Sequence, residues 1–549
     1  MKTTKISNFI MMAFLGCCSI SSVYAQQASA TGVQRPKLVV GIVIDQMRWD
    51  YLYRYQKRYT DGGFKRLLND GFSCENTVIP YVPSVTAIGH TCIYTGSVPS
   101  IHGIAGNNFV KNGKKVYCTD DDTVKPVGSN SEAGLMSPRN LWVTTIGDEM
   151  KIASNGRAKV VGVALKDRAS ILPAGHNPDG AFWFDDKSGN FITSTYYMNQ
   201  LPKWVKAFNS KKLPEHYLSE KWNTLYPKDT YTESTSDENE YENGIKKGVK
   251  ATLPLNLPEL YKKYGYNIIR NTPFGNSLTF DMAKAAIDGE QLGADDETDL
   301  LAVSCSSTDY IGHQVGTHAV ETEDTYLRLD KEIADFLSYL DAKVGKGNYL
   351  VFLSADHGAM NNVRFLQDRR IPAGNWDDGV AAKKLNEVIA KEFPNTGDLV
   401  KTVMNYQVFF NHEVIKNQHL DFAKIKQIVV DFLKEDSCVL YACDMEKTMT
   451  ESIPEEVKYR IVNGYNRERS GDIQIVLKPN FYTHGMKGTD HGAWNLYDTH
   501  IPLVFMGWGI KHGATTKRTF MTDIAPTIGA LIHVQAPNGC VGQPISFTR

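Results

Sequence analysis

The sequence predicts an α/β protein with a doubly wound, mostly parallel sheet that is flanked by helices and carries two inserted modules. Three observations support this prediction. Five short apolar runs rich in β-branched residues have the length of strands, helical patterns separate several of them, and two polar segments interrupt the alternation. Uninterrupted apolar runs are typical of parallel strands that are buried on both faces. We therefore expect βαβ units packed into one sheet.

The five runs follow one another along the whole chain: Leu38 to Ile44, Val160 to Leu165, Leu300 to Cys305, Tyr349 to Ser354 and Leu503 to Met506. Between the third and the fourth run, apolar residues recur at helical spacing from Tyr326 to Leu340 after an acidic start, which predicts an amphipathic helix. Polar residues follow each run. In an open parallel sheet the crevice that binds ligands lies beyond the carboxyl ends of the strands, so these residues are candidates for a site.

Two long segments do not fit the alternation of strands and helices. The first, residues 178–270, contains an expected hairpin, AFWFDDKSGNFITSTYY, and the polar run STSDENEYENG. The second, residues 362–480, contains two expected helices and a hairpin near its end. We therefore expect one insertion over the site and one cap, with the core divided among residues 33–177, 271–361 and 481–549.

The chain begins with a basic start, an apolar stretch and a small-residue end at residues 1–25, which is the pattern of a secretory signal peptide cleaved after Ala25. The apolar stretch is shorter than the ~20 residues that span a bilayer. No later segment is apolar enough to cross a membrane. We expect a periplasmic or secreted protein, with a lipid anchor at Cys17 as the alternative because Leu15-Gly16-Cys17 resembles a lipoprotein cleavage site.

Charge and cysteine content narrow the function. Lys plus Arg number 60 against 61 for Asp plus Glu, so no overall field attracts a nucleic acid polymer, and anion recognition has to be local. Small-molecule substrates are expected, and a monomer is favoured. Seven cysteines lie outside the leader, with Cys438 and Cys443 as a candidate disulfide pair. Because no zinc-finger spacing occurs among them, metal ligands are expected from Asp and His.

Six such residues lie at or just beyond the ends of the apolar runs or in polar loops. Asp309 and His313 are four residues apart, which places them on one face of a helical turn where both can bind one ion. Carboxylate and imidazole ligands without thiolate suit Zn²⁺, while Mn²⁺ and Fe remain open from side-chain types alone. We expect two zinc ions, and the further candidate ligands are Asp45, Asp356, His357 and His491.

Thr86 is the candidate nucleophile. It lies near an expected helix start after Pro83-Ser84, where backbone N–H groups and the helix dipole favour an alkoxide and an anionic phosphate. Its hydroxyl needs a nearby metal or base to lose its proton, so Thr86 is also a candidate metal ligand. The alternative is a plain helix N-cap. Asn107, after HGIAG, is a candidate donor to a phosphoryl oxygen.

Lys166 and Arg168 follow the second apolar run with one residue between them. On an extended backbone this spacing places both cations on the same side, where they can bind the non-bridging oxygens of a phosphate. The alternative is a solvated strand end. Two extra cations favour a dianionic phosphate monoester over a monoanionic diester.

These motifs together resemble the alkaline phosphatase superfamily and, within it, the PafA-type phosphate-irrepressible monoesterases of Bacteroidetes. The resemblance is carried by TAIGHTCIYTGSVPSIHGIAGNN, LKDRASILPAGH, STDYIGH, SADHG, TDHG and TDIAPTIGALI, in this order. It implies an alkaline-phosphatase-like fold. It also implies that the first zinc is bound by Asp309, His313 and His491, the second by Asp45, Asp356, His357 and the Thr86 oxygen, and the phosphoryl oxygens by Asn107, Lys166 and Arg168.

The function implied by the resemblance is that of an exported zinc-dependent alkaline phosphatase. Such an enzyme hydrolyses phosphate monoesters through a covalent phosphothreonine and releases inorganic phosphate. The alternative within the superfamily is a phosphodiesterase, a nucleotide pyrophosphatase-like enzyme or a phosphonate hydrolase, for which Lys166 and Arg168 would be dispensable. A further alternative is a non-catalytic protein that binds phosphorylated glycans, for which Thr86 would be dispensable.

Overall fold

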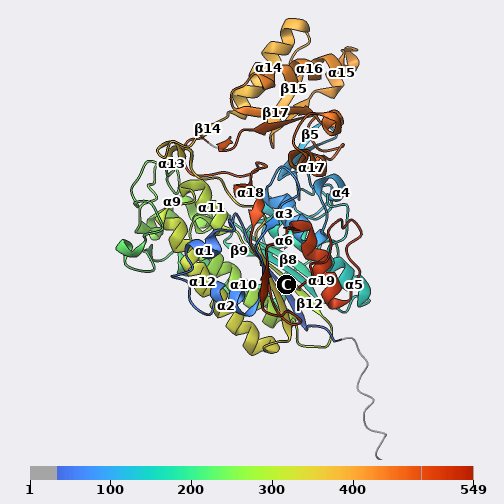
Figure 1. The fold of residues 1–549 in the computed structure, drawn as a ribbon. Helices are drawn as coiled ribbons and strands as arrows, with labels where there is room; N and C mark the ends of the chain where they lie inside the picture. Colours follow the sequence, from blue (N-terminus) through green and yellow to red (C-terminus); the bar gives the residue numbers. More distant parts are fainter. Residues whose placement is uncertain (1–33, 484, 548–549) are drawn as a thin grey trace, which may run out of the picture. The chain divides into compact units, whose positions relative to one another are not determined.

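The apolar runs form the middle of a ten-stranded sheet in the computed structural model, which describes residues 34–483 and 485–547 (Figure 1). The expected signal peptide and Cys17 lie outside the described residues. Every residue of the three central strands, Leu38–Ile44, Asp299–Cys305 and Tyr349–Ser354, is buried, as expected for strands covered on both faces. The strand order is β22 (Gly513–Thr515), β2 (Phe72–Cys74), β21 (Leu503–Gly507), β13 (Tyr349–Ser354), β1 (Leu38–Ile44), β12 (Asp299–Cys305), β7 (Val160–Ala164), β8 (Gly180–Asp185), β9 (Asn190–Ser194) and β6 (Pro126–Val127).

The run from β13 through β1, β12 and β7 to β8 is parallel, and the outer strands make the sheet mixed. Strand β21 pairs antiparallel with β13, so the expectation of a parallel strand at Leu503 to Met506 is wrong. The register gives the reason. Leu503 is paired with Ser354, so the chain re-enters the sheet at the end where β13 left it and has to run back.

The hairpin expected in residues 178–270 forms as β8 and β9, but both strands belong to the central sheet. Strand β8 pairs parallel with β7, and β9 returns antiparallel. The sequence predicted that this hairpin belongs to an inserted surface module. In the structure, it is part of the core. A hairpin with buried residues on both faces fits an extension of the sheet.

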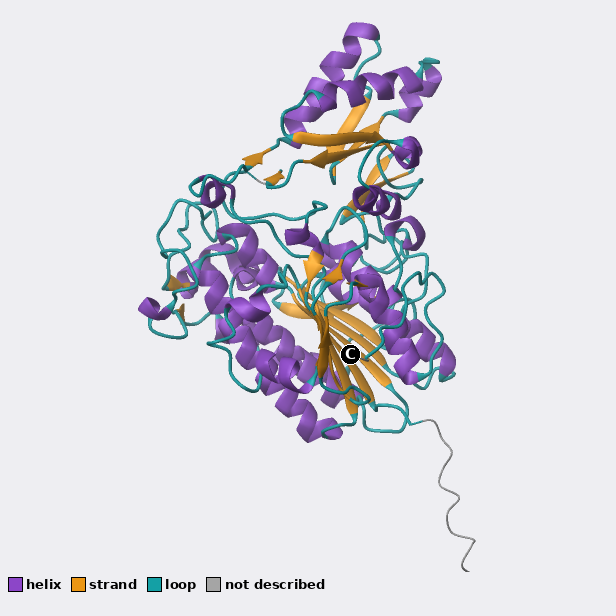
Figure 2. Ribbon diagram, in the orientation of Figure 1, coloured by secondary structure: helices purple, strands orange, loops and turns teal. Residues whose placement is uncertain are grey.

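Helices cover both faces of the sheet, as expected for a doubly wound fold (Figures 1 and 2). One face carries α1 (Tyr51–Arg54), α2 (Phe64–Asp70), α10 (Phe274–Glu290) and α12 (Val320–Leu340). The other carries α3 (Thr86–Thr95), α5 (Ile146–Ala153), α6 (Asp167–Ala174) and α19 (Ile524–Ile532). The amphipathic helix expected between the third and fourth runs is α12. Further helices are α4 (Pro99–His102), α7 (Lys203–Ser210), α8 (Leu213–Tyr217), α9 (Leu257–Tyr264), α11 (Ser307–Val315), α13 (Val363–Gln367) and α18 (Leu496–Thr499).

Residues 362–480 contain a second sheet with its own apolar core. Its strands, in the order β15 (Val400–Met404), β16 (Gln407–Phe410), β18 (Ile473–Leu477) and β17 (Val439–Asp444), are all antiparallel. The helices expected there form as α14 (Asp378–Glu392) and α16 (Phe422–Lys434), together with α15 (His412–Asn417) and α17 (Glu455–Gly464).

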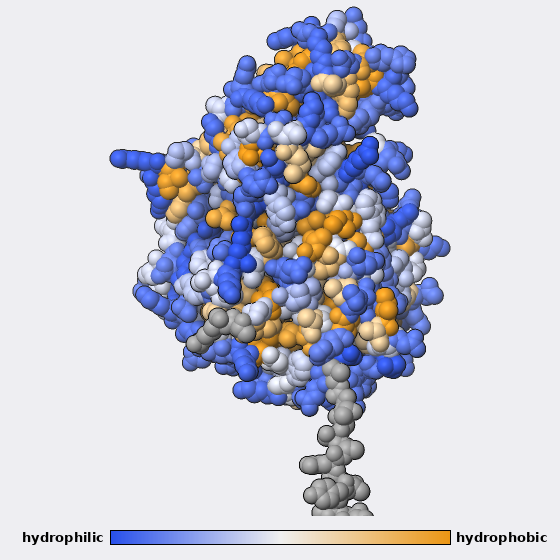
Figure 3. Space-filling view, turned by 45° about the vertical axis from the view of Figure 1, so that its right-hand side comes forward, coloured by the Kyte–Doolittle hydropathy of each residue, from blue (hydrophilic) through white to orange (hydrophobic). Residues whose placement is uncertain are grey.

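The remaining strands form one three-stranded sheet, in the order β20 (His500–Ile501), β3 (Thr77–Val78) and β23 (Thr519–Phe520), and three pairs: β4 (Asn108–Lys111) with β5 (Lys114–Tyr117), β10 (Lys221–Trp222) with β11 (Leu255–Asn256), and β14 (Gly374–Asn375) with β19 (Phe481–Tyr482). On the face shown in Figure 3, hydrophilic side chains predominate and apolar ones occur in scattered groups. Within the described chain, no helix combines the length and apolar character needed to cross a membrane. All seven described cysteines are free thiols, so the candidate pair Cys438 and Cys443 is not bonded.

Candidate active site

The predicted site residues meet at the carboxyl ends of the parallel strands. Asp45 follows β1, Asp356 follows β13, and Lys166 lies just beyond β7. Asp309 lies in the first turn of α11, directly after β12. Because these four strands are neighbours in the sheet, residues far apart in the sequence come together at one edge.

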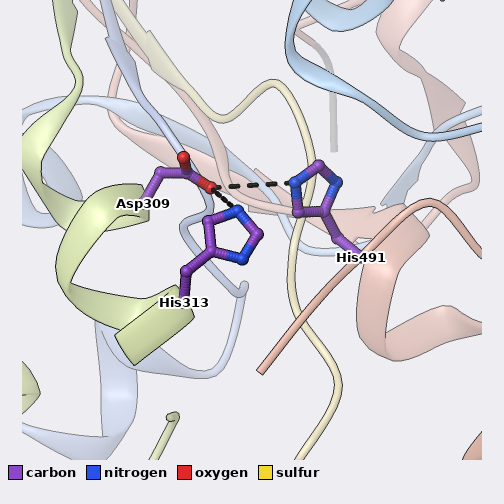
Figure 4. Close-up of side chains that lie close together, drawn as sticks. All are labelled: Asp309, His313 and His491. Atoms are coloured by element: carbon purple, nitrogen blue, oxygen red, sulfur yellow. Dashed lines mark ion pairs between the residues drawn. The ribbon is translucent and has the colours of Figure 1, made fainter. Parts of the chain in front are cut away.

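Asp309, His313 and His491 form the first group of candidate metal ligands, shown in Figure 4. Asp309 Oδ1 lies 3.0 Å from His313 Nε2 and 3.7 Å from His491 Nε2. The first two residues share one face of α11, as their spacing predicts, and His491 approaches from the loop before α18. One carboxylate and two imidazoles from two segments thus point toward a common centre.

Asp45, Asp356 and His357 form the second group, and all three are fully buried. His357 Nε2 lies 3.6 Å from Asp45 Oδ1 and 3.4 Å from Asp356 Oδ2. Among the described residues, neither of these two oxygens has a hydrogen-bond partner. A buried carboxylate oxygen without a donor is strongly destabilised unless a cation or a proton satisfies it.

The three imidazoles are oriented in the same way. In each, Nδ1 contacts a backbone carbonyl oxygen: His313 contacts Thr489 at 3.0 Å, His357 contacts Gly358 at 3.0 Å, and His491 contacts Ser84 at 2.8 Å. A carbonyl only accepts, so Nδ1 carries a hydrogen in each ring, and Nε2 holds the lone pair whenever the imidazole is neutral. This is the arrangement by which proteins hold metal-binding histidines. In each case Nε2 faces the carboxylates of its group.

Protonation in this cluster follows from burial and close charges. Burial lowers the pKa of His491 to about 3, and burial also lowers the pKa of His357, so both imidazoles are neutral at neutral pH. Although burial lowers it, the adjacent Asp309 carboxylate raises the pKa of His313 to about 9. Burial and the neighbouring Asp356 charge raise the pKa of Asp45 well above its usual value. Positive charge placed among these carboxylates would relieve that repulsion.

Lys166 lies between the two groups. Its Nζ donates to Asp45 Oδ2 and to Asp309 Oδ2, each at 2.6 Å. Although burial lowers it, these two carboxylates raise the pKa of Lys166, so the ammonium stays charged. Lys166 is therefore a fixed cation at the centre of the site.

Thr86 is the first residue of α3, and the N-cap is Val85. Its hydroxyl is therefore not used as a helix cap, which removes the alternative considered from the sequence. Thr86 Oγ1 lies 3.5 Å from Lys166 Nζ and 3.5 Å from His357 Nε2. Gly89, one turn further along, allows this approach: a Cβ there would lie 2.3 Å from the Asp356 carbonyl oxygen.

Asn107 lies beside the start of α3. Its Oδ1 accepts a hydrogen bond from the backbone N–H of Ala87 at 2.9 Å. This contact fixes the orientation of the amide, since the oxygen faces the backbone and the Nδ2 hydrogens face the other way. Asn107 can therefore present a donor to an anion next to Thr86.

Arg168 is held differently from the prediction. Strand β7 ends at Ala164 and α6 begins at Asp167, so Arg168 lies in the first turn of a helix and the argument from an extended backbone is wrong. Its guanidinium donates to the Tyr117 hydroxyl at 2.9 Å, and that hydroxyl donates to Asp167 Oδ1 at 3.0 Å. Asp167 therefore points toward Tyr117 and, through the Tyr117 hydroxyl, holds the Arg168 guanidinium in place.

Several residues that contact the site are not among the predicted catalytic residues and metal ligands. Gln46 adopts a positive φ of 65° and joins both groups: its backbone N–H donates to Asp356 Oδ1 and its side-chain amide donates to Asp309 Oδ1. The His90 ring lies between the Thr86 carbonyl and the Ser304 hydroxyl. Lys166 Nζ lies 5.0 Å from the ring centroid of Tyr310. Position next to a recognised motif was the only sequence signal for them.

The residues present fit two divalent metal ions. Asp45, Asp309 and Asp356 are buried carboxylates, and two of their oxygens, Asp45 Oδ1 and Asp356 Oδ2, accept no hydrogen bond among the described residues, although His90 Nδ1 lies 3.3 Å from Asp356 Oδ2. Three imidazoles turn Nε2 toward those carboxylates. Oxygen and imidazole nitrogen are the ligands that such ions take in hydrolases. The fold and the site together define a metallo-hydrolase built on a doubly wound α/β sheet.

Comparison with known proteins narrows this class. A family model described as type I phosphodiesterase / nucleotide pyrophosphatase matches residues 39–504. Alkaline phosphatase PafA of Elizabethkingia meningoseptica is 53% identical, over 97% of this chain and 98% of that protein. A protein of Myroides odoratus that bears the name calcium-transporting ATPase is 52% identical, over 96% of this chain and 97% of that one. A crystal structure of wild-type alkaline phosphatase PafA matches with a TM-score of 0.92 and 53% identity, over 94% of this chain and 99% of that one.

The chain belongs to the type I phosphodiesterase / nucleotide pyrophosphatase family and, within it, to the PafA-type alkaline phosphatases of the alkaline phosphatase superfamily. It is a phosphomonoester hydrolase. The resemblance inferred from the motifs and the α/β fold class are thereby confirmed.

Proposed function

We propose that this phosphatase is exported, depends on two zinc ions, and acts on small-molecule phosphate monoesters through a covalent phosphothreonine at Thr86. The observation that carries the proposal is the position of the Thr86 hydroxyl. It lies at a helix start, 3.5 Å from Lys166 Nζ and from His357 Nε2, beside both groups of candidate ligands. Export is supported by the signal-peptide pattern of residues 1–25, with a lipid anchor at Cys17 as the alternative.

The candidate ligands divide between the two ions as the two groups do in space. Asp309, His313 and His491 would hold one ion, and Asp45, Asp356 and His357 with the Thr86 oxygen would hold the other. When bound, the ions would supply Lewis acidity to the Thr86 hydroxyl and to the leaving oxygen. The buried, unpartnered carboxylate oxygens support this assignment.

Binding of the substrate phosphate falls to the cations and amides around Thr86. The α3 N-terminus and the Asn107 Nδ2 group offer N–H donors, while Lys166 and Arg168 offer positive charge. These groups are fixed before substrate arrives: Asn107 by Ala87, and Arg168 by Tyr117. Donors that are already oriented stabilise the charge of the transition state without reorganisation.

Phosphoryl transfer then proceeds in two steps. The Thr86 hydroxyl gives its proton to water, its oxygen forms a bond to phosphorus, and the bond from phosphorus to the alcohol oxygen breaks. The departing alkoxide takes a proton from water and leaves as the alcohol. A water molecule next attacks the phosphothreonine, the bond from Thr86 to phosphorus breaks, and inorganic phosphate leaves with Thr86 restored. The two displacements divide one difficult step into two easier ones.

The specific alternative is a diesterase, because the family model is named for phosphodiesterases. A diester carries one negative charge on its phosphoryl group, whereas a monoester carries two. Lys166 and Arg168 are the residues that distinguish these cases: Lys166 lies 3.5 Å from Thr86 Oγ1, and the Arg168 guanidinium, close enough to act on the charge of Lys166, adds a second cation that a diester would not need.

Removal of metal tests the cofactor assignment. Protein treated with a chelator and desalted is expected to lose phosphatase activity and to regain it with two equivalents of Zn²⁺ per chain, measured by elemental analysis and by titration of activity. Asp309→Ala should reduce the bound zinc to about one ion per chain, because it removes the only carboxylate from the group that Asp309 forms with His313 and His491. Asp61→Ala provides a control, since the Asp61 side chain is exposed and belongs to neither group. Full activity after complete zinc removal would contradict the assignment.

A further inference from the structure

Residues 362–480 reach the active site through the turn between β15 and β16. The two residues of this turn, Asn405 and Tyr406, have φ values of 56° and 58°. Two consecutive positive φ values match the two-residue turns of β-hairpins, in which Asn is common but an aromatic residue such as Tyr is not. A strained backbone conformation persists only where surrounding contacts hold it, and such conformations are common at functional sites.

Asn405 contacts the backbone on both sides of Asn107. Its Nδ2 donates to the carbonyl oxygen of Asn108 at 2.9 Å. On the other side, a Cβ at Gly106 would lie 2.4 Å from the same nitrogen, so Gly106 leaves the space that the Asn405 amide occupies. The side chain of Asn405 therefore fixes the backbone that carries Asn107.

Asn107 directly precedes β4 of the β4–β5 hairpin, and residues 362–480 contact this hairpin at a second point. The Asn107 carbonyl accepts from Cys118 N–H at 3.0 Å, which closes the hairpin. The carbonyl of Arg469 accepts from Val110 N–H at 3.4 Å. Tyr117, at the end of β5, donates to Asp167 and accepts from Arg168. One hairpin thus carries Asn107 at its start and the partner of Arg168 at its end.

Tyr406 lies near Gly492, in the loop that carries His491. A Cβ at Gly492 would lie 3.2 Å from Tyr406 Cε2 and 3.7 Å from Val85 Cγ1. Gly492 follows His491, and Val85 precedes Thr86. The turn is therefore enclosed by the Asn107 backbone, the His491 loop and the start of α3. These contacts account for its strained conformation.

We propose that Asn405 is a positioning residue for phosphate binding: it fixes the backbone around Asn107 so that the Asn107 Nδ2 group is aimed at a phosphoryl oxygen. The inference rests on the proposed role of Asn107 and extends it to a residue almost 300 positions away in the sequence. Asn405 itself does not touch the substrate. Its effect has to pass through Asn107, which makes the proposal testable by a double-mutant cycle.

The cycle uses Asn405→Gly, because glycine adopts a positive φ without strain and the substitution removes only the side chain. The zinc-loaded enzyme is assayed for kcat/KM with an aryl phosphate and for inhibition by inorganic phosphate, in the wild-type and Asn107→Ala backgrounds. Asn107→Ala is expected to lower kcat/KM by about 100-fold, as for a lost transition-state donor. Asn405→Gly is expected to lower it by about tenfold in the wild type and by less than about twofold in the Asn107→Ala background.

A matched control separates positioning from stability. Asn395→Gly replaces an exposed asparagine with a φ of 65° in the same segment, outside the contacts described above. We expect the two glycine variants to lower the midpoint of thermal unfolding by similarly small amounts. Asn395→Gly should leave kcat/KM unchanged. Asn405→Asp, which keeps the turn but replaces the donor by an acceptor facing the Asn108 carbonyl, should match Asn405→Gly in activity.

The outcomes distinguish the inference from the function on which it rests. If Asn107→Ala leaves kcat/KM unchanged, the proposed role of Asn107 is wrong. If Asn107→Ala lowers the rate and Asn405→Gly lowers it equally in both backgrounds, Asn405 acts by another route and the inference is wrong. Wild-type activity in both Asn405 variants would also overturn it.

Discussion

Replacing both Lys166 and Arg168 by alanine is expected to lower kcat/KM for an aryl phosphate monoester by on the order of 10⁴-fold, at roughly 10²-fold for each lost contact. Lys166 Nζ lies 3.5 Å from the Thr86 oxygen, and Arg168 is held by the Tyr117 hydroxyl. Both add positive charge where a dianionic phosphoryl group would bind. The rate for the corresponding methyl diester should change far less, because its phosphoryl group carries one charge fewer.

Two cations next to the opposite end of strand β7 offer a matched control. Arg157 and Lys159 are two residues apart just before the opposite end of β7, and both are outside the active site. Arg157→Ala with Lys159→Ala removes the same two charges from the chain and should leave both substrates unaffected. Equal losses for monoester and diester in the Lys166 and Arg168 double variant would mean that the two cations do not select the monoester. An unchanged monoester rate would remove them from the phosphate site.

Thr86→Ala is expected to lower kcat by on the order of 10⁵-fold, as for the loss of a catalytic nucleophile in other hydrolases. The variant keeps the donors around the phosphate, so inorganic phosphate should still bind. Thr86→Ser retains a hydroxyl and should retain much of the activity. Acid quenching of the wild-type enzyme during turnover of a labelled phosphate monoester should trap phosphate on Thr86, detected by mass spectrometry of the peptide.

Thr91→Ala is the control on the same helix. Its hydroxyl donates to the Ala87 carbonyl within α3 and faces no substrate, so its loss should affect stability and leave kcat unchanged. If Thr86→Ala retains more than about a tenth of the wild-type kcat, Thr86 is not the nucleophile, and a direct attack by water becomes the better account.

The sequence carried most of the information about the two groups of candidate metal ligands. Asp45 and Asp356 end apolar runs, and a run of that kind predicts both a buried strand and the edge at which it ends. The spacing of Asp309 and His313 matched one face of α11. These are local patterns, and local patterns are what one sequence records.

Features that depend on the return path of the chain were not predictable in this way. The apolar run of β21 contains no sign of its direction, which is set by where the chain re-enters the sheet. The β8–β9 hairpin looked like a surface element because its turn is polar, although its strands are buried in the central sheet. The helix that begins at Asp167 is another such case, since Lys166 and Arg168 were assigned to an extended backbone.

Contacts across long sequence separations were missed for the same reason. Gln46 joins Asp309 and Asp356, and Asn405 joins the Asn108 carbonyl from a different sheet. Gln and Asn are ordinary residue types at these two positions, and nothing near them in the sequence indicates which residues they contact. The positive φ of each became visible only in the structure.

The most direct test of the proposed function is the ratio of kcat/KM for an aryl phosphate monoester to that for its methyl diester, measured on zinc-loaded protein that starts at Gln26. The account predicts a preference for the monoester by on the order of 10²-fold or more, because Lys166 and Arg168 add charge that the dianion uses. A preference for the diester would contradict it, since the fold and the nucleophile would then serve a different substrate class.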